Sequence, residues 1–140
     1  MKKDSLANKV VTKMYDGDLF SQWLGIELLN VAEGSCTLRM IVRKDMLNGF
    51  DIAHGGITYS LADSALAFAS NGHGRMSVSV ETSISHTKAV KEGDVLTAVA
   101  EQLSLSDKIG VYSVAIKNQL DETVALFKGT VYRTSKFWEV

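Results

Sequence analysis

The sequence predicts a single α+β domain in which a curved antiparallel sheet of about six strands wraps around one long central helix. Three observations support this fold. A run of Ala, Ser, Leu and Phe over about residues 55–71 is typical of an enclosed helix. Two segments of alternating polarity precede this run and four follow it, with turn residues between them. Six strands and one long helix can bury each other only if the sheet curls around the helix.

The chain has the size and composition of one globular domain, spanning residues 1–140. A chain of 140 residues can bury roughly two-thirds of its unfolded surface, so one core is enough. Apolar residues make up 46% and charged residues 22%, which argues against a disordered chain. The formal charge of −1 supplies no field that would attract a polyanion, so we expect no nucleic-acid partner.

Three features indicate a cytoplasmic protein. The single cysteine, Cys36, cannot form a disulfide within the chain, which favours a reducing compartment. The first residues carry charges with no continuous apolar run behind them, so we expect no signal peptide. No segment approaches the ~20 apolar residues needed to span a bilayer, so we expect no membrane partner.

Residues 1–24 are predicted to form an N-terminal helical segment. Apolar side chains recur at near-helical spacing over residues 5–16, and either Ser5 or Asp4 can cap this helix. Residues 19–24 are predicted to form a second, short helical turn. We expect its aromatic residues to pack on the body of the domain.

Strands are predicted on both sides of the central helix. Alternating residues over 26–41, interrupted by a turn at 32–34, predict a hairpin. After the helix, four alternating segments separated by short turns favour one antiparallel meander. These four segments are residues 76–88, 95–105, 111–118 and 123–134.

A loop over residues 43–54 leads into the central helix, and one carboxylate, Asp63, interrupts that otherwise apolar helix. An acid inside such a segment costs several kcal/mol unless something compensates it or uses it. Asp63 is therefore either a functional group or a structural acid bonded to a neighbouring hydroxyl, such as that of Ser60 or Tyr59.

Several short motifs give the chain a family likeness. They are Met46-Leu47-Asn48-Gly49, His54-Gly55-Gly56, Ser60-Leu61-Ala62-Asp63 and the late run from Thr123 to Gly129. With these motifs, from about Gly25 onward, the chain resembles the hotdog-fold thioesterases of the phenylacetate-degradation type. The resemblance implies an acyl-CoA thioesterase that uses no cofactor, since CoA is part of the substrate. It also implies a homodimer as the minimal active unit, commonly a homotetramer, in which the helix start comes from one subunit and the acid from the other.

The start of the central helix suits an oxygen that gains negative charge. The first turn of a helix offers unpaired N–H groups and the positive end of the helix dipole. Gly55 and Gly56 leave this backbone without side chains, so a substrate carbonyl can approach closely. In line with the family motif, we expect the Gly55 amide to be the oxyanion donor. The alternative is that both glycines only let the loop turn sharply into the helix.

Asp63 is the expected nucleophile or the base that activates water. It lies roughly 12 Å beyond Gly55 at 1.5 Å per residue, too far for one subunit to place both groups on one thioester carbon. A two-fold axis resolves this difficulty, because the helix start of one chain can then meet the acid of another.

Other side chains are candidates for positioning the substrate. Asn48 is expected to bind the reacting water or the thioester oxygen, and His54 to fix the loop through its ring N–H or to lie near the sulfur. Ser79 aligns with a position that carries a hydroxyl in some relatives, and is otherwise a plain strand serine. The candidate cations for the CoA phosphates are Arg75, Lys88, Lys91 and Lys108. The spacing of the histidines supports no metal site, so we expect no metal.

The leading function is hydrolysis of an acyl-CoA to free acid and CoA. An aryl or medium-chain acyl group, as in phenylacetyl-CoA, is expected only from the resemblance. One alternative is a dehydratase of β-hydroxyacyl thioesters in which His54 and Asp63 share the acid and base roles, although the proline-rich segment that precedes the helix in those enzymes is missing. The other is a non-catalytic module that binds acyl-CoA.

Overall fold

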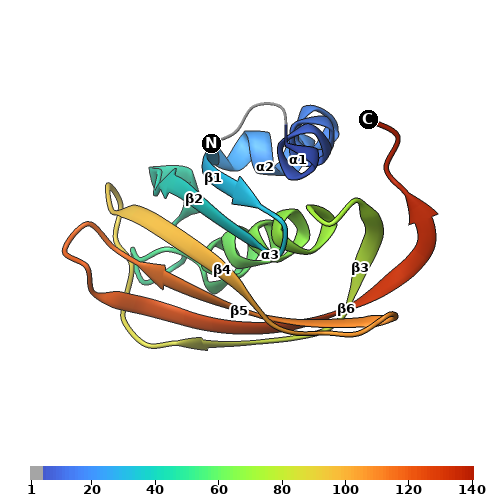
Figure 1. Cartoon of the computed structure of the whole chain (residues 1–140). Helices are drawn as coiled ribbons and strands as arrows, with labels where there is room; N and C mark the ends of the chain where they lie inside the picture. The colour runs from blue at the N-terminus through green and yellow to red at the C-terminus, as the bar shows by residue number, and fades with distance from the viewer. Residues whose placement is uncertain (1–4) are drawn as a thin grey trace.

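The computed structural model describes residues 5–140, which form an antiparallel six-stranded sheet curled around helix α3 (Figure 1). The helices are α1 (Leu6–Gly17), α2 (Leu19–Leu24) and α3 (Gly55–Asn71), with a 3-10 turn, η1 (Lys44–Met46), before α3. The strands are β1 (Glu27–Ala32), β2 (Ser35–Ile41), β3 (Arg75–His86), β4 (Val95–Leu105), β5 (Ile109–Lys117) and β6 (Thr123–Phe137). The predicted α+β class and the wrapped central helix are confirmed.

Helix α1 begins where the sequence predicts. The hydroxyl of Ser5 accepts the N–H of Asn8 at 3.1 Å and so caps the helix. The other predicted cap, Asp4, lies outside the described residues. Val10 and Val11 are fully buried, so the apolar stripe of α1 covers part of the core.

Helix α2 corrects one prediction about packing. Its aromatic side chains were expected against the body of the domain, yet Phe20 and Trp23 are 54% and 49% exposed. Ser21 and Leu24 face the body instead, and the Ser21 hydroxyl lies 2.8 Å from the hydroxyl of Ser64 on α3. A hydroxyl pair thus holds α2 on α3, and the aromatic face is left outside.

The order of strands in the sheet corrects a second prediction. The order is β1-β2-β4-β5-β6-β3, so only β4, β5 and β6 form the predicted meander. Strand β3 leaves the end of α3 and runs back along the far edge of the sheet, where it pairs with β6 (Figure 1). Alternation of residues predicts that a segment is a strand, but it does not select the neighbours of that strand.

Strand β3 is tied to α3 at both ends of their contact. The hydroxyls of Tyr59 and Thr82 lie 2.6 Å apart near the start of the helix. At its end, the amide of Asn71 donates to the carbonyl of Ser77 at 3.1 Å and accepts the N–H of Ser77 at 2.9 Å. The helix and the edge strand therefore run antiparallel and side by side.

Candidate active site

The start of α3 is capped by a histidine ring. Nδ1 of His54 accepts the N–H of Gly56 at 2.8 Å, so the ring holds the loop through an acceptor nitrogen and not through the N–H that we expected. The N–H of Gly55 donates to no acceptor among the described residues. The cap therefore uses one N–H of the first turn and leaves that of Gly55 available for a ligand.

The loop before α3 is organised by Asn48. Its side-chain oxygen accepts the N–H groups of Phe50 at 2.9 Å and Ile52 at 3.4 Å. Between them Asp51 adopts a left-handed conformation, with φ of 59°, which aspartate tolerates better than most residues. Because the oxygen is used by the loop, only the Nδ2 group of Asn48 is available to a substrate.

A cavity of about 360 Å³ opens between this loop and the segment that follows β3. Its lining combines the helix start with the end of the edge strand. The lining residues are Asn48, Ile52, Ala53, Gly55, Thr58, His86, Thr87, Lys88, Ala89 and Val90. The structure thus brings together three predicted site residues, Asn48, Gly55 and Lys88, whereas Asp63 does not line this cavity.

Two residues of the cavity were missed as site residues. Nδ1 of His86 lies 3.2 Å from the hydroxyl of Thr58, and that hydroxyl lies 3.1 Å from the carbonyl oxygen of Gly55. Nε2 of His86 would be 3.2 Å from a Cβ added to Gly55, so the ring lies directly beside the proposed oxyanion donor. The sequence carries no signal for this contact, because His86 is 31 positions from Gly55 and joins it only through the packing of β3 on α3.

Asp63 lies further along α3 and is half-buried. Burial of the side chain, and after it the negative charge of Asp18, raise the pKa of the Asp63 carboxyl above its ordinary value. The carboxyl accepts no hydrogen bond from residues 5–140, and the hydroxyl of Tyr59 bonds Thr82 instead. A structural acid bonded to Ser60 or Tyr59 is therefore not what the structure describes, and the carboxylate keeps its lone pairs for another partner.

Ser79 lies on the face of β3 that is turned toward α3, the helix that carries Asp63. Its partner across the β3–β6 ladder is Val131, whose side chain is buried against the core, and directly opposite residues share one face of a sheet. Asp63 lies one helical turn beyond Tyr59, on the face of α3 that is tied to β3. Ser79 is therefore on the inner face of the sheet, and Asp63 is on the side of α3 that faces β3.

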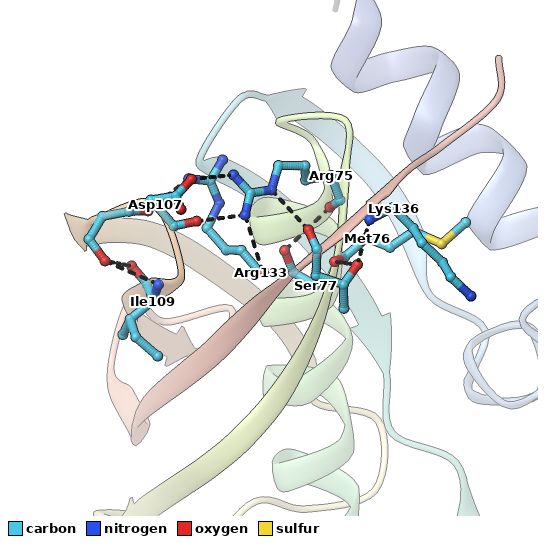
Figure 2. Close-up of polar contacts among 9 residues, drawn as sticks. Arg75, Met76, Ser77, Asp107, Ile109, Arg133 and Lys136 are labelled. Carbon is cyan, nitrogen blue, oxygen red and sulfur yellow. Dashed lines mark hydrogen bonds and ion pairs between the residues drawn. The ribbon is translucent and has the colours of Figure 1, made fainter.

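Arg75, which was predicted to bind phosphate, instead forms hydrogen bonds within the sheet (Figure 2). Its guanidinium donates to the carbonyl oxygens of Thr134, Asp107 and Arg133 and to the carboxylate of Asp107, at 2.6 to 3.2 Å. It begins β3, whereas His86 ends it, and the extended strand separates them by roughly 35 Å. Within one chain, Arg75 fastens a corner of the sheet and does not face the cavity.

The three predicted lysines divide between the two ends of the molecule. Lys108 lies in the turn near Arg75, with its ammonium 6.0 Å from the centre of the Tyr132 ring. Lys88 lines the cavity and forms an exposed ion pair with Glu122 at 2.7 Å. Lys91 is exposed three positions further on. Lys88 is therefore the predicted cation best placed to meet a phosphate group at the cavity.

Across residues 5–140, no three His, Cys, Asp or Glu side chains are grouped as ligands for a metal ion. No helix in the same part of the chain is both long and apolar enough to cross a membrane.

Comparison with known proteins assigns the family. The sequence pattern of the Thioesterase superfamily matches residues 50–125, which include α3, the edge strand β3 and all of the cavity lining except Asn48. The chain therefore belongs to the thioesterase superfamily. The chain is also 39% identical over 120 residues to the acyl-coenzyme A thioesterase PaaI of Escherichia coli, a match that covers 86% of each protein.

Solved structures of related proteins share the fold of this thioesterase. The E. coli PaaI protein from the phenylacetic acid degradation operon superposes with a TM-score of 0.93 at 36% identity, over 94% of this chain and 96% of that one. A hypothetical thioesterase of Streptococcus pneumoniae, solved with coenzyme A, gives a TM-score of 0.85 at 27% identity over 91% of this chain and 99% of that one. The expected hotdog fold, the likeness to phenylacetate-degradation thioesterases and the class of thioester hydrolase are confirmed.

Proposed function

We propose that this thioesterase hydrolyses acyl-CoA to a free acid and CoA, at a site completed by a second copy of the chain. The observation that carries the proposal is the N–H of Gly55 at the start of α3, which has no acceptor within residues 5–140 and lies in a cavity that Lys88 also lines. An N–H at a helix start stabilises an oxyanion. An exposed ion pair contributes little, so Lys88 can exchange Glu122 for a phosphate group of CoA.

The expected chemistry divides between the start of α3, at Gly55, and its middle, at Asp63. Ionised Asp63 takes a proton from water while the water oxygen attacks the thioester carbon, and the carbonyl electron pair moves to the oxygen held by Gly55. When the carbonyl reforms, the C–S bond breaks and its electron pair leaves with sulfur, which takes up the proton. Direct attack by Asp63, through an anhydride that water then opens, uses the same groups. A single turnover in oxygen-labelled water separates the routes, since only the anhydride route can place label in the carboxyl of Asp63.

A two-fold dimer would bring the two halves together. Gly55 and Asp63 are eight positions apart on one straight helix, or roughly 12 Å. Strand β3 is an edge strand that pairs only with β6 among residues 5–140, and its Val78 and Val80 are 55% and 60% exposed. Long apolar edges invite pairing with another chain. Antiparallel pairing of β3 with its copy would set two α3 helices side by side, so that the start of each faces the acid of the other.

The pneumococcal relative supports the choice of Asp63 and Ser79. Two variant structures of that protein replace an aspartate and a threonine with alanine. The two positions are as far apart in that chain as Asp63 and Ser79 are in this one. We propose that the Ser79 hydroxyl orients the water or acyl oxygen next to Asp63.

We further propose an aryl or medium-chain acyl group, with no bound cofactor. The preference is supported by the name of the E. coli relative, whose operon degrades phenylacetic acid. The dehydratase alternative is disfavoured by His54, because the lone pair that a base would need is already occupied by the N–H of Gly56.

Thiol release from a panel of phenylacetyl-, benzoyl-, hexanoyl- and palmitoyl-CoA tests the function. We expect release that falls by at least 100-fold in Asp63→Ala, with the native fold retained. Full turnover in that variant would overturn the role of Asp63. Formation of enoyl-CoA from 3-hydroxyacyl-CoA would establish a dehydratase, and CoA binding without any thiol release would establish a binding module. Sedimentation with and without Val80→Lys tests the dimer: a monomer that keeps full activity would refute the shared site.

A further inference from the structure

We infer that His86 is a substrate-binding residue, which accepts a hydrogen bond from the first amide N–H of the CoA arm. The inference rests on the proposed function and adds a contact to it. The arm of a CoA thioester continues from sulfur through two methylene groups to an amide, so this N–H is the first polar hydrogen beyond the reacting bond. A residue that accepts a hydrogen bond from this N–H must therefore lie close to the oxyanion donor.

The contacts of His86 determine which ring nitrogen is available. The hydroxyl of Thr58 has one hydrogen to donate. Its oxygen lies 3.1 Å from the carbonyl oxygen of Gly55 and 3.2 Å from Nδ1 of His86. Both contacts are satisfied at once only if Nδ1–H donates to the hydroxyl and the hydroxyl donates to the carbonyl. In this arrangement Nε2 of the neutral ring carries a lone pair and is an acceptor.

The acceptor nitrogen lies where the CoA arm would pass. Nε2 approaches a Cβ added to Gly55 to 3.2 Å, so it lies next to the backbone that would hold the thioester oxygen. Lys88 follows His86 by two residues, at a bend just after the end of β3, and lines the same cavity. The cavity therefore brings together an oxyanion donor, an amide acceptor and a cation, which match the carbonyl, the first amide and the phosphates of a CoA thioester.

A role as an acid for the departing sulfur fits these contacts less well. An acid would need a hydrogen on Nε2 in addition to that on Nδ1, which requires a charged ring. A thiolate is also a good leaving group, because thiols ionise near pH 8.5, so its departure gains little from protonation. The lone pair on Nε2 instead matches an N–H donor.

A pair of substrates that differ in one atom tests the contact. One is a phenylacetyl thioester of N-acetylcysteamine, which has the amide N–H, and the other is the thioester of 2-mercaptoethyl acetate, in which oxygen replaces the N–H. We expect the wild-type enzyme to show a KM about tenfold lower for the amide, with similar kcat, since the bond forms equally in ground and transition states. His86→Phe should remove this preference by raising KM for the amide alone.

Two further variants make the result decisive. Thr58→Val frees the ring and should weaken the same preference, whereas His73→Phe, whose ring bonds Gln102 away from the cavity, should keep it. A preference that persists in His86→Phe, or an equal loss on both substrates, would overturn the inference. If neither thioester is cleaved by wild-type enzyme, the proposed function fails, and calorimetry then tests the contact separately. CoA should bind His86→Phe about tenfold more weakly, while adenosine bisphosphate, which lacks the amide, should bind both proteins equally.

Discussion

Nδ1 of His54 accepts the N–H of Gly56 at 2.8 Å, and this bond defines how the loop enters α3. A side-chain acceptor at a helix start contributes about 1 kcal/mol. The neighbouring N–H of Gly55 remains unpaired among the described residues. The same histidine therefore stabilises the helix and, by taking only one donor, leaves the other to the substrate.

The cap predicts different outcomes for two substitutions of His54. His54→Ala should lower the free energy of unfolding by about 1 kcal/mol and reduce kcat/KM, because the first turn loses its acceptor. His54→Asn should retain stability and activity, since asparagine is a good cap. Thermal melting and thiol release measure both effects. A stable but inactive His54→Asn would show that the imidazole acts on the substrate itself.

Gly55→Ala should impair the oxyanion site. The added Cβ would lie 3.2 Å from Nε2 of His86, within the space where we place the thioester. We expect kcat/KM to fall by about 100-fold, comparable to the loss of one oxyanion donor. Gly17→Ala is the matched control, because a Cβ there meets no atom of the described residues within 4 Å. An active Gly55→Ala enzyme would place the oxyanion elsewhere.

Asp63→Asn should stabilise the fold at neutral pH while removing activity. The carboxyl has an ordinary pKa of 3.8, and burial raises it in the folded chain, so the folded state binds more protons between the two values. Stability therefore falls as pH rises through that window and stays lowered above it. We expect the variant to melt a few degrees higher at pH 7 and to match wild type below pH 3.8. A lower melting temperature at pH 7 would contradict this account.

Asp18→Asn should shift the pH dependence of turnover. The charge of Asp18 is the second cause of the raised pKa of Asp63, and catalysis needs Asp63 ionised. Removing that charge should move the acidic limb of the kcat/KM profile to lower pH. Asparagine can still cap α2 through its side-chain oxygen, as Asp18 does for Ser21 at 2.9 Å, so the helix should persist. An unmoved limb would mean that another group titrates.

Lys88 and Arg75 should respond differently to removal of their charge. Lys88→Met should raise KM for an acyl-CoA roughly tenfold, because a phosphate contact is lost, and leave the N-acetylcysteamine thioester unaffected. Arg75→Met should lower stability, since it breaks four hydrogen bonds at the sheet corner. Melting curves and KM values for both substrates distinguish the two. A KM effect confined to Arg75→Met would reverse the assignment.

Local chemistry in the sequence determined most of the helices and strands. Caps, turns and alternation predicted α3 and the six strands, because each depends on residues a few positions apart. The sequence also predicted that Asp63 lies in an apolar helix. It predicted the distance from Asp63 to Gly55 as well, because the rise per residue of a helix converts eight positions into a length.

Only the tertiary structure decided which distant residues meet. The sequence could not place β3 beside β6, because alternating polarity describes a strand and not its partner. That placement brought His86 to Gly55 and carried Arg75 to the opposite end, where backbone carbonyls occupy it. Contacts between residues far apart in the chain depend on how whole elements pack, so a lysine in the cavity and an arginine at the sheet corner look alike in sequence.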